Sequence, residues 1–140
     1  MQNKQIMATS KVVYVGGLRT ECTHLKSGNK ILTDAPTDNH GKGEAFSPTD
    51  LAATALGTCM ISIMGIVALK NKFVFEGGDA DITKIMAEAP RRIFEIITVI
   101  NMPKLPFTAE QKKMLENAAI NCPVAKSLHP QIKQTISFVY

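Results

Sequence analysis

The chain has 140 residues, a formal net charge of +4 and three cysteines. This length predicts a single domain, residues 1–140, with room for a hydrophobic core, and scattered lysines with few aromatic side chains argue against a nucleic-acid partner. Because the first residues lack the apolar core of a secretory signal and the cysteines are too few and irregular for a disulfide framework, we expect a reducing, cytoplasmic location.

The N-terminal third is predicted to form a small antiparallel sheet. Residues 11–15, 18–25 and 30–33 are rich in β-forming side chains, and glycine-containing turns separate them. Residues 34–46 contain proline, asparagine and several glycines without an apolar period, which is typical of a loop. This loop leads directly to the most apolar part of the chain.

A long helix is predicted to begin at Ser47. Ser47 suits the N-cap, Pro48 the first helical position, and Asp50 the return partner of a capping box. Residues 51–69 carry no charge and are apolar or small on every face, so we expect a core helix covered on nearly all sides. A membrane span is the less favoured alternative. So short a chain can hardly cover such a helix alone, which suggests an oligomer.

The C-terminal half is predicted to combine a hairpin, two helices and a last strand. Residues 80–88 and 93–102 alternate as two strands of a hairpin. A capping box then starts a helix that ends near residue 121, a short helix covers 124–128, and residues 132–140 alternate as a strand. The order β-β-β-α-β-β-α-α-β favours an α+β fold over a doubly wound parallel sheet.

Two cysteines lie on apolar faces of different predicted helices. Cys59 lies in the middle of the long helix, and Cys122 precedes Pro123 at a predicted helix N-terminus, where free backbone N–H groups stabilise a thiolate. Both could pack simply as small hydrophobic residues, since free cysteine is often buried. The alternative is a thiol pair with redox chemistry.

Both cysteine motifs carry a resemblance to a known family. SPTDLAATALGTC, followed by NCPVAKSL, resembles the two motifs of the osmotically induced protein C and organic hydroperoxide resistance (OsmC/Ohr) family, and is closest to its OsmC-like branch. The resemblance implies an OsmC-like fold, with antiparallel sheets packed around two core helices. It also implies an intertwined homodimer with active sites at the interface, in agreement with the sparse cover of the long helix.

The resemblance also implies a function and a role for each site residue. The family's members are antioxidant, stress-response peroxidases, and this resemblance makes Cys59 the cysteine that attacks an organic hydroperoxide. Cys122 is then the resolving cysteine that closes a disulfide with Cys59, and a dithiol, with a lipoyl group as one candidate, is the reductant. Arg19 lies where the family places its active-site arginine, although a solvated strand position is the alternative. No metal or cofactor is implied.

The chain departs from the family at one supporting position. Peroxidases of the family have a glutamate directly after the proline of the first motif, where it pairs with the arginine, and here that residue is Thr49. Asp50 is expected to cap the helix instead. Glu44, in the preceding loop, is the candidate substitute partner for Arg19.

Other function classes receive weaker support. Cys22 and His24 would share one face of a strand as a metal pair, but the further ligands of a zinc site are missing. A cysteine hydrolase would pair Cys59 with His129 or His40, and both histidines lie in helix-breaking segments. A third alternative is a non-enzymatic dimer that binds a small apolar ligand or senses oxidants.

Overall fold

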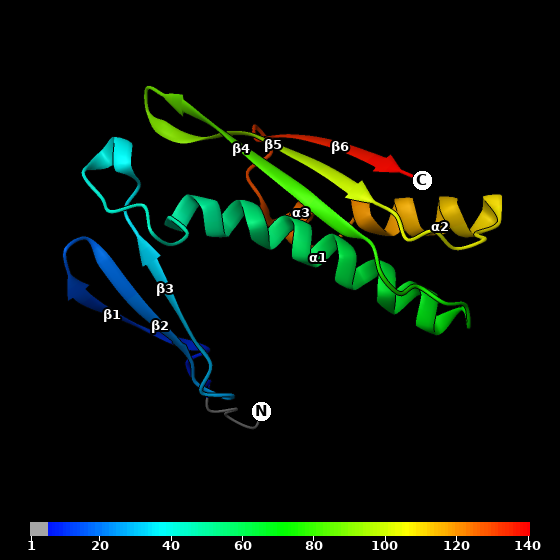
Figure 1. Cartoon of the computed structure of the whole chain (residues 1–140), viewed down its shortest axis with the longest axis horizontal. Coiled ribbons are helices and arrows are strands. Elements are labelled where there is room, and N and C mark those ends of the chain that lie inside the picture. Colours follow the sequence, from blue (N-terminus) through cyan, green and yellow to red (C-terminus); the bar gives the residue numbers. More distant parts are fainter. Residues whose placement is uncertain (1–5) are drawn as a thin grey trace. The chain divides into compact units, whose positions relative to one another are not determined.

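The computed structural model describes residues 6–140. Residues 1–5 belong to the N-terminal segment in which we expect no secretory signal, and they lie outside the described residues. Its elements follow the predicted order β-β-β-α-β-β-α-α-β, with one added turn of 3-10 helix (Figure 1). The chain divides into two compact units, Met1–Leu51 and Ala52–Tyr140. A single domain remains a prediction.

The first unit contains the predicted antiparallel sheet. Its strands are β1 (Ser10–Gly16), β2 (Arg19–His24) and β3 (Lys30–Asp34), in the order β1-β2-β3. The turn between β1 and β2 passes through Gly17 and Leu18, both in the left-handed region with φ near 60°. Glycine adopts this conformation without steric cost, which is why the sequence signals a hairpin here.

A compact loop follows β3 and carries the chain back to it. A 3-10 turn, Thr37–Asn39, begins the loop, and the N–H of Asp34 donates to the carbonyl of Phe46 at 3.0 Å. A Cβ atom at Gly41 would lie 1.6 Å from the carbonyl oxygen of Ala35. Only glycine fits there, so the loop path depends on Gly41.

Helix α1 (Pro48–Lys70) starts at the predicted capping box. The N–H of Ser47 donates to the Asp50 carboxylate and the N–H of Asp50 donates to the Ser47 hydroxyl, both at 3.0 Å. Its own chain covers α1 only in part, as the short chain length led us to expect, because one stripe is buried whereas Leu69 is 80% exposed. The buried stripe consists of Ala53, Leu56, Gly57, Met60, Met64 and Ala68.

By length and composition, α1 is also the one helix among residues 6–140 that could cross a membrane. Core helices of globular proteins meet the same criterion. Here the buried stripe belongs to a hydrophobic core shared with Ile96, Ile100 and Leu115 of other elements. The contacts within the chain are therefore those of a core helix.

The second unit contains a mixed sheet. Strand β4 (Asp79–Glu88) pairs antiparallel with β5 (Arg91–Asn101), as the predicted hairpin requires. Strand β6 (Lys133–Val139) pairs with β5 in parallel, so the prediction of purely antiparallel sheets was wrong. Two helices connect β5 to β6, and a connection of this length allows the chain to return in the same direction.

Helices cover one face of this sheet, as Figure 1 shows. Helix α2 (Ala109–Ile120) begins at a capping box that Thr108 and Gln111 form, and the short helix α3 (Pro123–Ser127) follows it. Leu115 of α2 is fully buried, which contributes about 1.5–3 kcal/mol. The fold is thus α+β, with two main helices and two small sheets.

Candidate active site

Helices α1 and α2–α3 bring the two predicted cysteines together in the core of the second unit. Cys59 is partly buried and packs against the hydrophobic core from α1. Cys122 is fully buried within that core, at the N-cap of α3. Cys59 packs against the core cluster that contains Cys122, and after burial it adds to the rise in the pKa of the Cys122 thiol. Cys59 and Cys122 are more than sixty residues apart in the sequence, and the fold places both at the same hydrophobic core.

Burial has the largest effect on the pKa of the Cys122 thiol. It raises the pKa of the Cys122 thiol above its ordinary value, and interactions with Cys59 add to the rise. The N–H of Ala125, at the start of α3, donates to Sγ of Cys122 at 3.5 Å and acts in the opposite direction. The predicted helix N-terminus is therefore present, but desolvation outweighs it and favours the protonated thiol.

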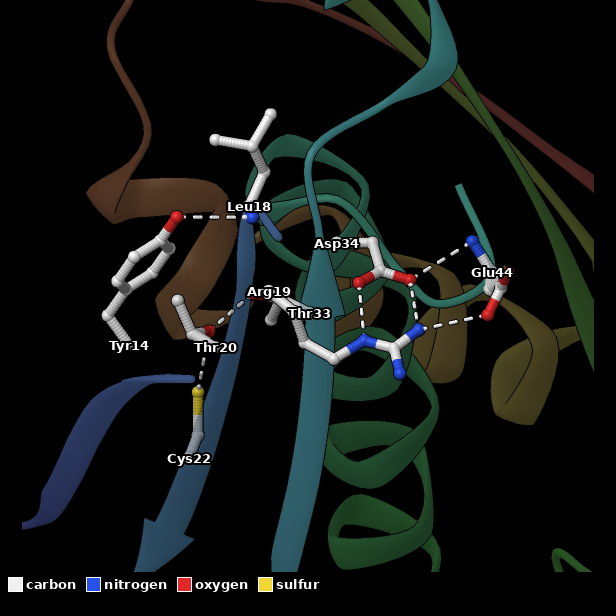
Figure 2. Close-up of polar contacts among 8 residues, drawn as sticks. All are labelled: Tyr14, Leu18, Arg19, Thr20, Cys22, Thr33, Asp34 and Glu44. Carbon is white, nitrogen blue, oxygen red and sulfur yellow. Dashed lines mark hydrogen bonds and ion pairs between the residues drawn. The ribbon is translucent and has the colours of Figure 1, made fainter. Parts of the chain in front are cut away.

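Arg19 is held by two carboxylates in the first unit (Figure 2). Its Nε donates to Oδ1 of Asp34 at 2.7 Å and its Nη2 to Oδ2 at 2.9 Å, which is a two-point ion pair. Nη2 also donates to Glu44 at 3.1 Å. Both contacts raise the pKa of Arg19, so the guanidinium keeps its charge. Arg19 is thus a fixed cation and not a loosely solvated strand residue.

Asp34 is the one member of this cluster that sequence reasoning missed. It was assigned to the beginning of the loop, yet it ends β3, directly opposite Arg19 of β2. Asp34 is fully buried. The hydrogen bonds from Arg19 lower the pKa of the Asp34 carboxyl group, whereas burial acts in the opposite direction. The turn between β2 and β3 sets this register, so counting outward from that turn pairs Arg19 with Asp34.

The three residues that were candidates to support Arg19 make different contacts in the structure. Glu44 pairs with Arg19, as the candidate substitute partner should. Asp50 caps α1, as expected. Thr49 places its hydroxyl 3.3 Å from that of Ser47 at the helix start. The position of the family's glutamate therefore belongs to the cap of α1 in this chain.

The residues proposed for a metal pair or a cysteine hydrolase contact near neighbours in the sequence. Sγ of Cys22 lies 3.7 Å from the hydroxyl of Thr20, and Nδ1 of His24 lies 2.6 Å from that of Ser27. Nδ1 of His129 accepts from the N–H of Gln131 at 3.0 Å. His40 ends the 3-10 turn in a left-handed conformation. No group of three His, Cys, Asp or Glu side chains within residues 6–140 could hold a metal ion.

A cavity of about 310 Å³ also opens in the second unit. Its lining is mostly apolar and contains neither Cys59 nor Cys122. The cavity is lined by Phe73, Val74, Leu105, Pro106, Phe107 and Gln111.

Known structures share the α+β fold of this chain. A Psychrobacter arcticus 273-4 protein, described as belonging to the osmotic stress induced and detoxification response, is 48% identical over 97% of this chain and 98% of its own, with a TM-score of 0.91. The organic hydroperoxide resistance protein OsmC of Legionella pneumophila is 17% identical over 97% of this chain and all of its own (100%), with a TM-score of 0.71. At this identity, the second likeness shows the fold alone.

A third structure, the organic hydroperoxide resistance protein OhrB of Bacillus subtilis, is 19% identical over 94% of this chain and 98% of its own, with a TM-score of 0.64. No curated protein matches the chain. The family model described as OsmC-like protein matches residues 41–137, which include both cysteine motifs. That match spans more than half of the chain, and the chain therefore belongs to the OsmC-like protein family.

Proposed function

We propose that the protein is a thiol peroxidase that reduces organic hydroperoxides, with Cys59 as the attacking and Cys122 as the resolving cysteine. The observation that carries this proposal is that Cys59 packs against the same hydrophobic core in which Cys122 is fully buried. Two solved structures of the same fold, from Legionella pneumophila and Bacillus subtilis, are named as organic hydroperoxide resistance proteins. These names support the reaction class proposed here.

The first step oxidises Cys59. Its thiolate attacks the terminal oxygen of the hydroperoxide, the O–O bond breaks, and the products are a sulfenic acid on Cys59 and an alkoxide that takes up a proton as the alcohol. Sulfur loses two electrons and the peroxide gains them. The thiolate form is required because a protonated thiol is a poor nucleophile.

The second step closes the disulfide. The sulfur of Cys122 attacks the sulfenic sulfur of Cys59, the S–O bond breaks, and the hydroxyl leaves as water with the proton of the Cys122 thiol. The raised pKa of Cys122 suits this order, because a protonated thiol does not compete with Cys59 for the peroxide. A dithiol then exchanges with the disulfide and restores both thiols. A lipoyl group is one such donor.

Arg19 supplies the positive charge in this proposal. A guanidinium carries five N–H donors in a rigid plane, so it can bind a thiolate and a peroxide oxygen together. The charge of Arg19 is secured by Asp34 and Glu44. The role of Arg19 at the thiolate is proposed from the family resemblance alone.

The active protein is proposed to be a homodimer in the cytoplasm. Each unit leaves large apolar side chains exposed, among them Val12 at 60% and Tyr14 at 64% on β1 and Leu69 at 80% on α1. Apolar surface of this extent usually marks an interface. A second copy that covers it would give the intertwined dimer, and light scattering should then report the mass of two chains. A single-chain mass at micromolar concentration would contradict the dimer.

Peroxide turnover tests the proposed reaction. The protein with dithiothreitol should consume cumene hydroperoxide continuously, and faster than hydrogen peroxide, because the apolar wall of α1 suits an alkyl or aryl group. Thiols that stay reduced in the presence of the peroxide would contradict the proposal. Hydrolysis of a thioester without any reductant would instead indicate a hydrolase.

A further inference from the structure

The cavity of about 310 Å³ lies between the end of α1 and the start of α2. Phe73 and Val74, which follow α1, line one side, and residues 105–107, which precede α2, line another. Gln111, in the first turn of α2, completes the lining. All of these residues belong to the second unit of the chain, so the cavity does not depend on how the two units are placed.

The end of α1 fixes the position of Phe73. Lys72 adopts a left-handed conformation with φ 58°, and its N–H donates to the carbonyl of Leu69 at 3.3 Å. The N–H of Phe73 donates to the carbonyl of Ala68 at 3.1 Å. These two hydrogen bonds form a Schellman motif, which closes the last turn of a helix and sets the direction of the residues that follow. Phe73 is therefore held against the end of α1.

A close contact joins the segment after α1 to the segment before α2. A Cβ atom at Gly78 would lie 2.7 Å from the carbonyl oxygen of Asn101 and 2.9 Å from Cδ of Pro103, so only glycine allows this approach. Phe73 and Phe107, one from each segment, form an edge-to-face pair with ring centroids 6.2 Å apart. The two sides of the cavity are thus in fixed contact, and the space is present before any ligand binds.

The aromatic side chains favour an aromatic ligand. Phe73 and Phe107 line the cavity, and Phe75 extends the cluster, with its ring centroid 6.3 Å from that of Phe107. Aromatic rings prefer such tilted and edge-to-face contacts over face-to-face stacking, and a ligand ring can join them. At about 30 Å³ for each water-sized group, the cavity holds about ten non-hydrogen atoms, which is one substituted benzene ring.

Gln111 supplies the one polar side chain of the lining. Its Oε1 accepts the N–H of Thr108 at 2.9 Å in the capping box, so the carbonyl side of its amide is already engaged. Its Nε2 donates to no residue in the part of the chain that the structure describes. Nε2 therefore offers N–H donors at the cavity, and a ligand that uses them must carry an oxygen acceptor.

The acceptor should be uncharged. None of the six lining residues carries a charge. A carboxylate that entered the cavity would lose its hydration without gaining an ion pair, and this cost exceeds what one hydrogen bond from Gln111 contributes. A carbonyl or hydroxyl oxygen loses much less hydration. The chemistry of the lining therefore selects a neutral oxygen group.

We propose that this cavity is a binding site for small, neutral aromatic compounds with one carbonyl or hydroxyl oxygen. Phe73 and Phe107 contact the ring, and Nε2 of Gln111 donates to the oxygen. Neither Cys59 nor Cys122 lines the cavity, and at about 1.5 Å per residue α2 places Gln111 about 15 Å from Cys122 along its axis. The site is separate from the thiols, and the inference does not rest on the proposed function.

Binding is measured by heteronuclear NMR titration of the whole protein with three probes of similar shape and about nine non-hydrogen atoms each, close to the capacity of the cavity. Acetophenone carries a carbonyl, α-methylstyrene has a CH₂ group in place of the carbonyl oxygen, and benzoate carries a charge. Acetophenone should shift the side-chain amide of Gln111 and the backbone amides of Phe73 and Phe107 in a saturable way, with a Kd on the order of 1 mM. The other two probes should bind about tenfold more weakly, or weaker still.

Gln111→Glu is the matched variant for the hydrogen bond. Glutamate is a usual partner in the capping box, so the start of α2 is kept, whereas both N–H donors of Nε2 are lost. Its affinity for acetophenone should fall about tenfold. Gln131→Glu makes the same charge change at an exposed glutamine outside the lining and should leave the affinity unchanged. If Gln111→Glu does not unfold cooperatively, the comparison of acetophenone with α-methylstyrene tests the same hydrogen bond in the unmodified protein.

Three results would overturn the inference. The first is the lack of a saturable shift at the lining residues with acetophenone up to about 10 mM, tenfold above the expected Kd. The second is equal affinity for acetophenone and α-methylstyrene, which would refute the role of Gln111 and with it the class of ligand. The third is tighter binding of benzoate than of acetophenone. None of these results bears on the proposed peroxidase, which is measured separately by peroxide turnover.

Discussion

Replacing Cys59 by serine should abolish the reduction of organic hydroperoxides. A serine hydroxyl is not ionised near neutral pH and does not attack the O–O bond, so no sulfenic acid can form. Loss of the nucleophile of an enzyme typically costs about three orders of magnitude or more in turnover. The measurement is the consumption of cumene hydroperoxide in the presence of dithiothreitol, with the variant's secondary structure checked by circular dichroism.

Cys22→Ser provides the matched control for that result. Cys22 lies on β2 with its sulfur near the Thr20 hydroxyl, in a different unit of the chain from Cys59. The control should retain the turnover of the unmodified protein. If turnover is retained in Cys59→Ser but lost in Cys22→Ser, the reactive thiol is Cys22 on β2, and the proposed site is refuted.

Replacing Cys122 by serine should preserve the first oxidation and prevent its resolution. Without a second thiol beside Cys59, the sulfenic acid persists and successive additions of peroxide convert it to the sulfinic acid. Turnover should therefore decay towards zero as peroxide is added. Intact mass spectrometry checks this directly, since Cys59 should gain the mass of two oxygen atoms.

The same variant preserves the start of α3. Serine is a preferred N-cap residue and can accept the N–H of Ala125 that Sγ of Cys122 accepts. Burial of the hydroxyl costs some stability, which thermal unfolding will register. Sustained turnover without sulfinic acid in Cys122→Ser would show that the disulfide is dispensable and that Cys122 only packs in the core.

Local signals in the sequence predicted most of the elements. The capping boxes at Ser47 and Thr108 act within one turn of helix, so the residues that start each helix are adjacent in the chain. The hairpins of the first sheet likewise depend on glycine turns a few residues long. Such signals need no knowledge of the tertiary structure.

Features that depend on distant residues were harder to predict. The direction of β6 is set by its pairing with β5 across two intervening helices, and no turn residue records it. The partner of Arg19 was missed for a similar reason. Asp34 reads as a loop residue by composition, yet strand pairing makes it the buried anchor of the guanidinium.

The cover of α1 illustrates the same limit. Its composition correctly indicated a core helix, because hydrophobicity is a property of the residues themselves. Composition could not tell which faces the same chain covers. The structure shows one buried stripe on α1, and the exposed remainder is the reason to expect a second subunit.

The pairing of the two thiols is tested most directly by mapping disulfides after treatment with one molar equivalent of cumene hydroperoxide. The fold packs Cys59 against the hydrophobic core that contains Cys122, so we expect one intramolecular disulfide between them, with Cys22 still free for alkylation. A disulfide that involves Cys22, or thiols that all remain reduced while the peroxide is consumed, would contradict the proposed reaction.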